Sequence, residues 1–154
     1  MQHGADFIGT DRQEDTYFKC GNGRLKLREG NIENFLIFYE RNDIAGPKKS
    51  NVELYGPSNT ASLKNVLSHA YGTRVIVKKS REIFFIDHVK FHIDKVDKLG
   101  TFVEIEAIDK NNQFETKELE EKCNYFLSYL NIAPKDLIEN SYSDILLKQK
   151  NNGQ

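Results

Sequence analysis

The sequence predicts an antiparallel α+β domain with a barrel-like sheet. Short runs of β-forming residues follow one another across polar turns, and most of these turns leave no room for a helix. One helical pattern is inserted into the strand series, and further helices follow its end. Because parallel strands need a long crossover connection, usually a helix, this order argues against a βαβ sheet.

The strands are expected in order along the chain. The first, 13–18, ends in Thr-Tyr-Phe, and the turn Gly21-Asn22-Gly23 joins it to 24–28 as a hairpin, because Gly and Asn tolerate positive φ. A polar turn over 29–34 leads to the third strand, and a loop around Gly46-Pro47 separates the third strand from the fourth. The remaining strands are predicted at 35–41, 50–55, 74–81, 83–87, 89–96 and 101–108.

Two stripes at helical spacing predict helices. The first stripe has Asn59 or Thr60 as its N-terminal cap and Gly72 as its stop, and its apolar positions are Leu63, Val66, Leu67 and Ala70. The second consists of Leu119, Cys123, Phe126, Leu127 and Leu130, and Pro134 opens a last short segment. We expect a single domain over 1–147, followed by a frayed polar tail over 148–154.

Composition excludes several classes of protein. The 154 residues include 22 basic and 23 acidic side chains, a net charge of -1, which argues against nucleic acid or a membrane surface as partner. Two cysteines make neither a disulfide scaffold nor a paired metal motif. Since there is no apolar run of about 20 residues and no signal-peptide pattern, a cytoplasmic protein is expected.

Charged side chains alternate along several predicted strands. Side chains two positions apart share a face, so Lys26 joins Arg28, Lys79 joins Arg81, and Glu104 joins Glu106, while His92 shares a face with Asp94. Taken singly, each such face is most simply the solvated side of a sheet. If all of them turn inward in a closed sheet, the charges need partners, and a divalent metal with a polyphosphate would supply them. The spacing leaves both readings open.

The order of these motifs resembles the CYTH family. The segments Gln13-Glu14-Asp15-Thr16-Tyr17-Phe18 and Gly23-Arg24-Leu25-Lys26-Leu27-Arg28 are similar to the family's opening hairpin. A basic strand over 75–81 and an acidic hairpin over 92–106 follow in the family's order. Ser141-Tyr142-Ser143-Asp144 resembles the C-terminal signature of the bacterial class IV adenylate cyclases. The resemblance extends from about residue 11 to residue 147.

The resemblance implies an eight-stranded antiparallel tunnel that binds a triphosphate with Mg²⁺ or Mn²⁺. The residues that would hold phosphate oxygens are Lys26, Arg28, Arg41, Lys79 and Arg81, of which Lys79 and Arg81 would also act in catalysis. Glu104 and Glu106 would hold the metal, with Asp94 as a further catalytic carboxylate beside it. Arg24 and Lys49 would lie near the tunnel mouth, and a homodimer would be unsurprising.

One departure concerns the start of the chain. The family's Glu-x-Glu-x-Lys strand normally precedes the 13–18 segment, whereas residues 1–6 look like the end of a helix. One tunnel wall would then be absent, with an edge exposed to pairing. Three explanations are open. The favoured one is a start inside a longer chain. The others are a strand borrowed from a partner and a degenerate member without catalysis.

The resemblance favours a cyclase that converts ATP to cyclic AMP and pyrophosphate. A triphosphatase acting on inorganic or thiamine triphosphate is the first alternative, because the same charged site would serve it. A non-catalytic binder of polyphosphate or nucleotide is the second, and it is favoured by the missing strand.

Overall fold

The computed structural model describes residues 4–153. The elements follow in the order β1 (Asp6–Phe18), β2 (Arg24–Glu29), β3 (Asn34–Arg41), β4 (Ser50–Tyr55), α1 (Thr60–Tyr71), β5 (Thr73–Ile86), β6 (Val89–Val96), β7 (Gly100–Ala107), α2 (Thr116–Tyr129), a 3₁₀ turn (Pro134–Asp136) and α3 (Tyr142–Asn152). This order confirms the antiparallel α+β prediction, with one helix inside the strand series and the others after it.

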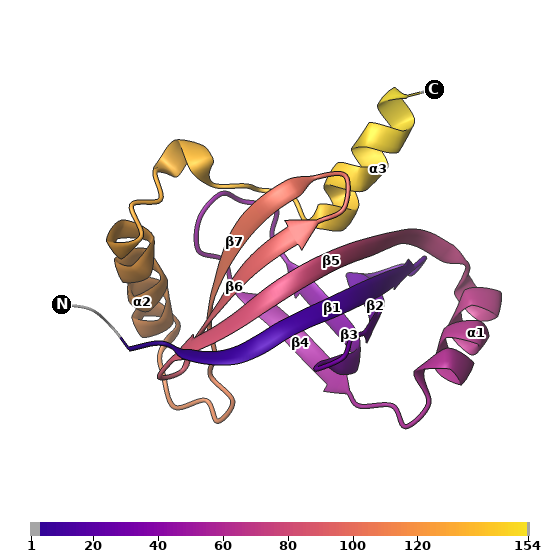
Figure 1. The fold of residues 1–154 in the computed structure, drawn as a ribbon, viewed down its shortest axis with the longest axis horizontal. Helices are drawn as coiled ribbons and strands as arrows, with labels where there is room; N and C mark the ends of the chain where they lie inside the picture. The colour runs from indigo at the N-terminus through magenta and orange to yellow at the C-terminus, as the bar shows by residue number, and fades with distance from the viewer. Residues whose placement is uncertain (1–3, 154) are drawn as a thin grey trace.

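The strands form one antiparallel sheet in the order β4-β3-β2-β1-β5-β6-β7. It curls into a half-barrel, with α1 and α2 near opposite ends of the molecule and α3 beside the β6–β7 hairpin (Figure 1). In the part of the chain that the structure describes, β4 and β7 are the two outer strands of this order, and every residue of β4 is exposed. The expected open edge is therefore present.

Three local predictions were wrong. Asp6 begins β1, a 13-residue strand, so it does not end a helix; residues 1–3 of that expectation lie outside the described residues. The predicted strands 74–81 and 83–87 are one strand, β5, because the long β1 pairs with it from Thr73 to Phe85. The polar segment after residue 147 continues α3 as far as Asn152.

Helix α1 has the predicted boundaries for the predicted reasons. The Asn59 side chain accepts a hydrogen bond from the backbone N–H of Ser62, and Gly72 ends the helix with a φ of 81°. Lys64 on α1 forms ion pairs with Glu14 of β1 and Glu29 of β2. The helix therefore covers the convex face of the sheet, where the Leu27 side chain is fully buried.

Helix α2 covers the same convex face near β7. Phe126 is its buried residue, and the centroid of its ring lies 4.9 Å from that of Phe91 in an edge-to-face arrangement. Leu127, expected in the apolar stripe, is only half-buried, and Leu130 is exposed. None of the helices within residues 4–153 is long and apolar enough to cross a membrane.

Replacing Phe126 with alanine is expected to lower the free energy of unfolding by about 3–5 kcal/mol, because the ring is 5% exposed and packs in a cluster with Val89 and Phe91. Urea denaturation of both proteins measures this difference. The same substitution at the half-buried Leu127 should cost clearly less, and an equal loss at both positions would contradict the assignment of Phe126 as the anchor.

Candidate functional site

The concave face of the sheet carries the charged side chains. Cross-strand pairing places Lys26 opposite Tyr17, Arg28 opposite Asp15, and Lys79 opposite Gln13. Arg81 stands between Asp11 and Asp94, and His92 faces Glu104. Because side chains opposite one another share a face, the alternation seen in the sequence becomes one continuous surface. By this pairing and the alternation along each strand, all the predicted site residues lie on the concave face: Lys26, Arg28, Arg41, Lys79, Arg81, Asp94, Glu104 and Glu106.

Asp15 is the centre of the first group of charges, here called the Asp15 cluster, with Lys26, Arg28 and Lys79. Its carboxylate is fully buried and accepts two hydrogen bonds from Arg28, from Nε at 2.9 Å and from Nη2 at 2.8 Å. Lys79 Nζ donates to it at 2.8 Å, and Lys26 Nζ lies 3.3 Å away. Three cations thus share one carboxylate.

The three cations around one carboxylate shift the pKa values within the Asp15 cluster. Burial would raise the pKa of Asp15, but Lys26, Arg28 and Lys79 hold it well below its ordinary value. Burial lowers the pKa of Lys79 to about 7, with Asp15 opposing that shift and Arg28 and Arg81 adding to it. The cluster therefore holds more positive charge than one carboxylate compensates, which is the electrostatic requirement for an anion site.

Arg81 is the centre of the second group. Its guanidinium donates to both oxygens of Asp94, from Nε at 2.7 Å and from Nη2 at 2.6 Å, and Nη2 also reaches Glu104 Oε2 at 3.1 Å. Burial would lower the pKa of Arg81, but Glu104 and Asp94 raise it further above its ordinary value. Arg81 therefore remains a cation at any physiological pH.

His92 lies beside this group and is 2% exposed. Its Nδ1 is 3.1 Å from Glu104 Oε2, while its Nε2 is buried and has no hydrogen-bond partner within the described residues. Burial lowers the pKa of His92, against the hydrogen bond to Glu104. Burial would raise the pKa of Glu104, but Arg81 and His92 lower it well below its ordinary value.

Helix α3 covers one end of the concave face. The Tyr142 hydroxyl donates to Asp94 Oδ2 at 2.9 Å, and Lys79 Nζ lies 5.7 Å from the centre of the Tyr142 ring. Arg24 pairs with Asp144 in the same turn of the helix, and Ser141 caps that turn. The segment 141–144 that resembles the cyclase signature is therefore in contact with both groups of charges.

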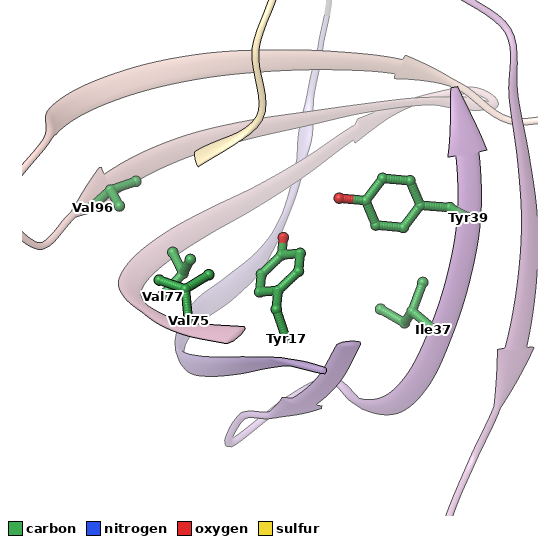
Figure 2. Close-up of a cluster of buried hydrophobic side chains, with 6 residues drawn as sticks. All are labelled: Tyr17, Ile37, Tyr39, Val75, Val77 and Val96. Atoms are coloured by element: carbon green, nitrogen blue, oxygen red, sulfur yellow. The ribbon is translucent and has the colours of Figure 1, made fainter. Parts of the chain in front are cut away.

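An apolar cluster under α3 fills that end of the concave face, which is here called the trough. Figure 2 shows Tyr17 and Tyr39 with their hydroxyl groups directed toward the concave side of the sheet. The cluster also contains Ile37, Val75, Val77 and Val96, with Leu146 and Leu147 of α3 packed against it. The charged groups therefore lie between this apolar cluster and the ion pair of Lys90 with Glu33, whose charged atoms are 3.0 Å apart.

Arg41 lies at the β3 side of the trough. Its guanidinium carbon is 5.5 Å from the centre of the Tyr39 ring, and its Nε is a buried donor without a partner among residues 4–153. Arg24 lies over the same ring at 5.9 Å, whereas Lys49 is exposed in the loop before β4. Arg41 therefore has a donor free for an anion in the trough.

The carboxylates fit a metal only in part. In the portion covered by the structure, no group of three or more His, Cys, Asp and Glu side chains is arranged to hold an ion. Asp94 is occupied by Arg81 and Tyr142, and Glu104 uses its Oε2 for both Arg81 and His92. Glu106 is exposed on the same face. Since Mg²⁺ commonly takes one or two carboxylates together with waters and phosphate oxygens, Glu104 and Glu106 fit an ion that arrives with its phosphates.

No site role was predicted from the sequence for Asp15, Glu33, Lys90 and Tyr142, although Tyr142 lies in the segment that resembles the cyclase signature. For Asp15 a signal existed, because a hairpin that turns at Gly21-Asn22-Gly23 places it opposite Arg28. Glu33 and Lys90 meet across the trough although 57 positions separate them, and no spacing rule finds such a pair.

Comparisons with known proteins identify the family of the chain. The CYTH domain family matches residues 3–142. A protein of Methanocaldococcus jannaschii named "Putative adenylate cyclase" is 28% identical over 151 residues, which cover 92% of this chain and 85% of that protein.

Solved structures share the fold. The PH1012 protein of Pyrococcus horikoshii superposes with a TM-score of 0.77 at 22% identity, covering 91% of this chain and 85% of that one. A structure from Vibrio parahaemolyticus described as a "putative adenylate cyclase" gives a TM-score of 0.73 at 21% identity, covering 93% and 84% of the two chains. At these identities the likeness concerns the fold.

Proposed function

Since the chain belongs to the CYTH domain family, we propose that it is a class IV adenylate cyclase-like enzyme, which converts ATP to cyclic AMP and pyrophosphate. The observation that carries the proposal is the Asp15 cluster, where three buried or largely buried cations share a single carboxylate. A triphosphate with several negative charges compensates this surplus of positive charge, and its oxygens accept hydrogen bonds from the N–H donors that remain free. The name of the Methanocaldococcus relative supports the cyclase reading within this class.

The roles of the residues follow from their positions along the trough. Lys26, Arg28 and Lys79 bind the phosphates, and Arg81 and Arg41 extend this binding surface on either side. When the ribose 3′-oxygen attacks the α-phosphorus, its proton passes to solvent water and the bond from the α-phosphorus to the bridging oxygen breaks. Pyrophosphate leaves with that oxygen and with the negative charge that develops on it. Cations fixed in advance around that leaving group stabilise this charge without reorganising. Asp94 holds Arg81 in position through two hydrogen bonds.

A divalent cation would be held by Glu104 and Glu106 and would neutralise phosphate oxygens. Lys90 lies opposite Glu106 in the pairing of β6 with β7, so both a cation and carboxylates would surround the metal. The cations of the concave face orient the triphosphate, and Leu146 and Leu147 of α3 pack against the apolar cluster at one end of that face.

Product analysis tests the proposal. The purified protein is incubated with ATP or with tripolyphosphate, in Mg²⁺ and in Mn²⁺, and the products are separated by chromatography. Cyclic AMP together with pyrophosphate is the expected result. Release of orthophosphate alone would replace the cyclase by a triphosphatase. Binding without turnover would favour a non-catalytic binder, to which the open sheet edges also point.

Replacing Glu106 with alanine is expected to raise the Mg²⁺ concentration needed for half-maximal activity by about tenfold, because one of two metal carboxylates is lost. Stability should stay within about 0.5 kcal/mol, since the side chain is exposed. Activity at a series of Mg²⁺ concentrations measures the shift. Glu53→Ala, an exposed carboxylate on β4, is the control. An unchanged Mg²⁺ dependence in the Glu106 variant would remove Glu106 from the site.

A further inference from the structure

We propose that Asp15 is a positioning residue of the triphosphate site, whose buried carboxylate gathers Lys26, Arg28 and Lys79 into one phosphate-binding group. The inference rests on the proposed function, because it names the residue that arranges the cations of that same site. Asp15 itself repels phosphate, so its place at the centre of a phosphate site needs a reason.

The geometry supplies that reason. The cations come from β2 and β5, the strands on either side of β1, and Asp15 on β1 is the group that both sides can reach. Arg28 donates two hydrogen bonds to the Asp15 carboxylate, so its orientation is fixed, whereas Lys79 donates one hydrogen bond to it. An ammonium group has three N–H donors, so Lys79 keeps donors for a phosphate. Lys26, at 3.3 Å, is the most loosely held of the three.

Charge repulsion explains why the carboxylate is required. Three buried cations at one place repel each other, and a low-dielectric surrounding strengthens that repulsion. Without a central anion they would move apart or lose a proton. Lys79 is the group that loses its proton, because burial already lowers its pKa to about 7, whereas arginine stays charged.

The groups that act on Lys79 come from several elements. Among the described residues, Asp15 is the carboxylate in contact with its ammonium group, at 2.8 Å. The other charged or titratable groups facing it lie on β2, β5, β6, β7 and α3, and they are Lys26, Arg28, Arg81, Asp94, Glu104 and Tyr142. Asp94 and Glu104 are paired with Arg81, so Asp15 is the main group that keeps Lys79 protonated.

The substitution Asp15→Asn tests the proposal, with Asp11→Asn as its matched control. Asp11 lies on the same face of β1 and is equally buried, but it accepts hydrogen bonds from Gln13 and from the backbone N–H groups of Ile32 and Glu33. Asp11 therefore holds the turn after β2, and within residues 4–153 it forms no ion pair with a lysine or an arginine. Both variants can lower stability, whereas only the Asp15 variant should change the protonation of Lys79.

Two measurements read out the effect. In the ligand-free protein, NMR titration of the Lys79 side chain should show that its pKa falls by at least about one unit in Asp15→Asn and does not move in Asp11→Asn. The wild-type to variant ratio of tripolyphosphate affinities should be about tenfold larger at pH 8 than at pH 5, because only at the higher pH does the variant lose the charge of Lys79 more than the wild-type protein does. A ratio that stays constant with pH, or a Lys79 titration that is the same in both variants, would overturn the proposal.

The two measurements separate this inference from the proposed function. If the wild-type protein binds no triphosphate, the proposed function fails, while the NMR titration still tests the role of Asp15. If Asp15→Asn does not fold, the double variant Asp15→Asn with Lys79→Met removes one charge of each sign. It should bind tripolyphosphate about tenfold more weakly than Lys79→Met alone, because Lys26 and Arg28 are no longer gathered. Equal affinities of these two proteins would contradict the proposal.

Discussion

Replacing Arg81 with methionine is expected to lower the free energy of unfolding by about 3–5 kcal/mol and to abolish triphosphate binding. The guanidinium is buried and makes three hydrogen bonds, two to Asp94 and one to Glu104. Its loss leaves the buried Asp94 without a cationic partner, and breaking a buried ion pair from one side carries a cost of this size.

Urea denaturation and calorimetric titration with tripolyphosphate measure the two effects. Arg74→Met is the matched control, because Arg74 is on the same strand but exposed, and both stability and affinity should be unchanged there. An Arg81→Met protein that keeps wild-type affinity would remove Arg81 from the site.

Replacing Lys79 with methionine is expected to separate binding from stability. Affinity for the triphosphate should fall by about 100-fold, since a buried cation contributes a charge-assisted hydrogen bond. Stability should change by less than about 1 kcal/mol or rise, because Asp15 keeps Arg28 and Lys26 as partners.

The stability difference between Lys79→Met and the wild-type protein is expected to depend on pH. The native pKa of Lys79, about 7, lies below its ordinary value of 10.5, so between these values the unfolded state binds more protons. The stability of the wild-type protein therefore rises with pH across this window. The stability advantage of Lys79→Met should be largest below pH 7 and shrink toward pH 10. The exposed Lys78→Met is the control, and an equal pH dependence in both variants would contradict the assignment.

Local rules predicted most of the fold. The cap at Asn59 and the stop at Gly72 fixed α1, and alternation with turn residues located β4 and β6 without error. The errors arose where pairing overrides local preference. The prediction left Glu82 as a break between the strands 74–81 and 83–87, but the ladder with β1, in which Glu82 pairs with Thr10, continues the strand through it.

The site could be predicted only in part for a related reason. Alternation identified the charged faces, because it depends on one strand at a time. Which carboxylate pairs with which cation depends on sheet order. The sequence could not show that Asp94 and Glu104 meet Arg81, or that Tyr142 returns from α3 to Asp94. Asp94 and Glu104, which were expected at the metal, are therefore already paired with Arg81, and alternation could not reveal these pairs.

A crystal structure of the protein with Mg²⁺ and tripolyphosphate tests the central claim most directly. We expect the phosphate oxygens to lie within hydrogen-bond distance of Lys26, Arg28, Lys79 and Arg81 on the concave face, with the ion at Glu104 and Glu106. Phosphates bound on the convex face, or an Asp15 cluster unchanged beside a ligand seated elsewhere, would contradict the account.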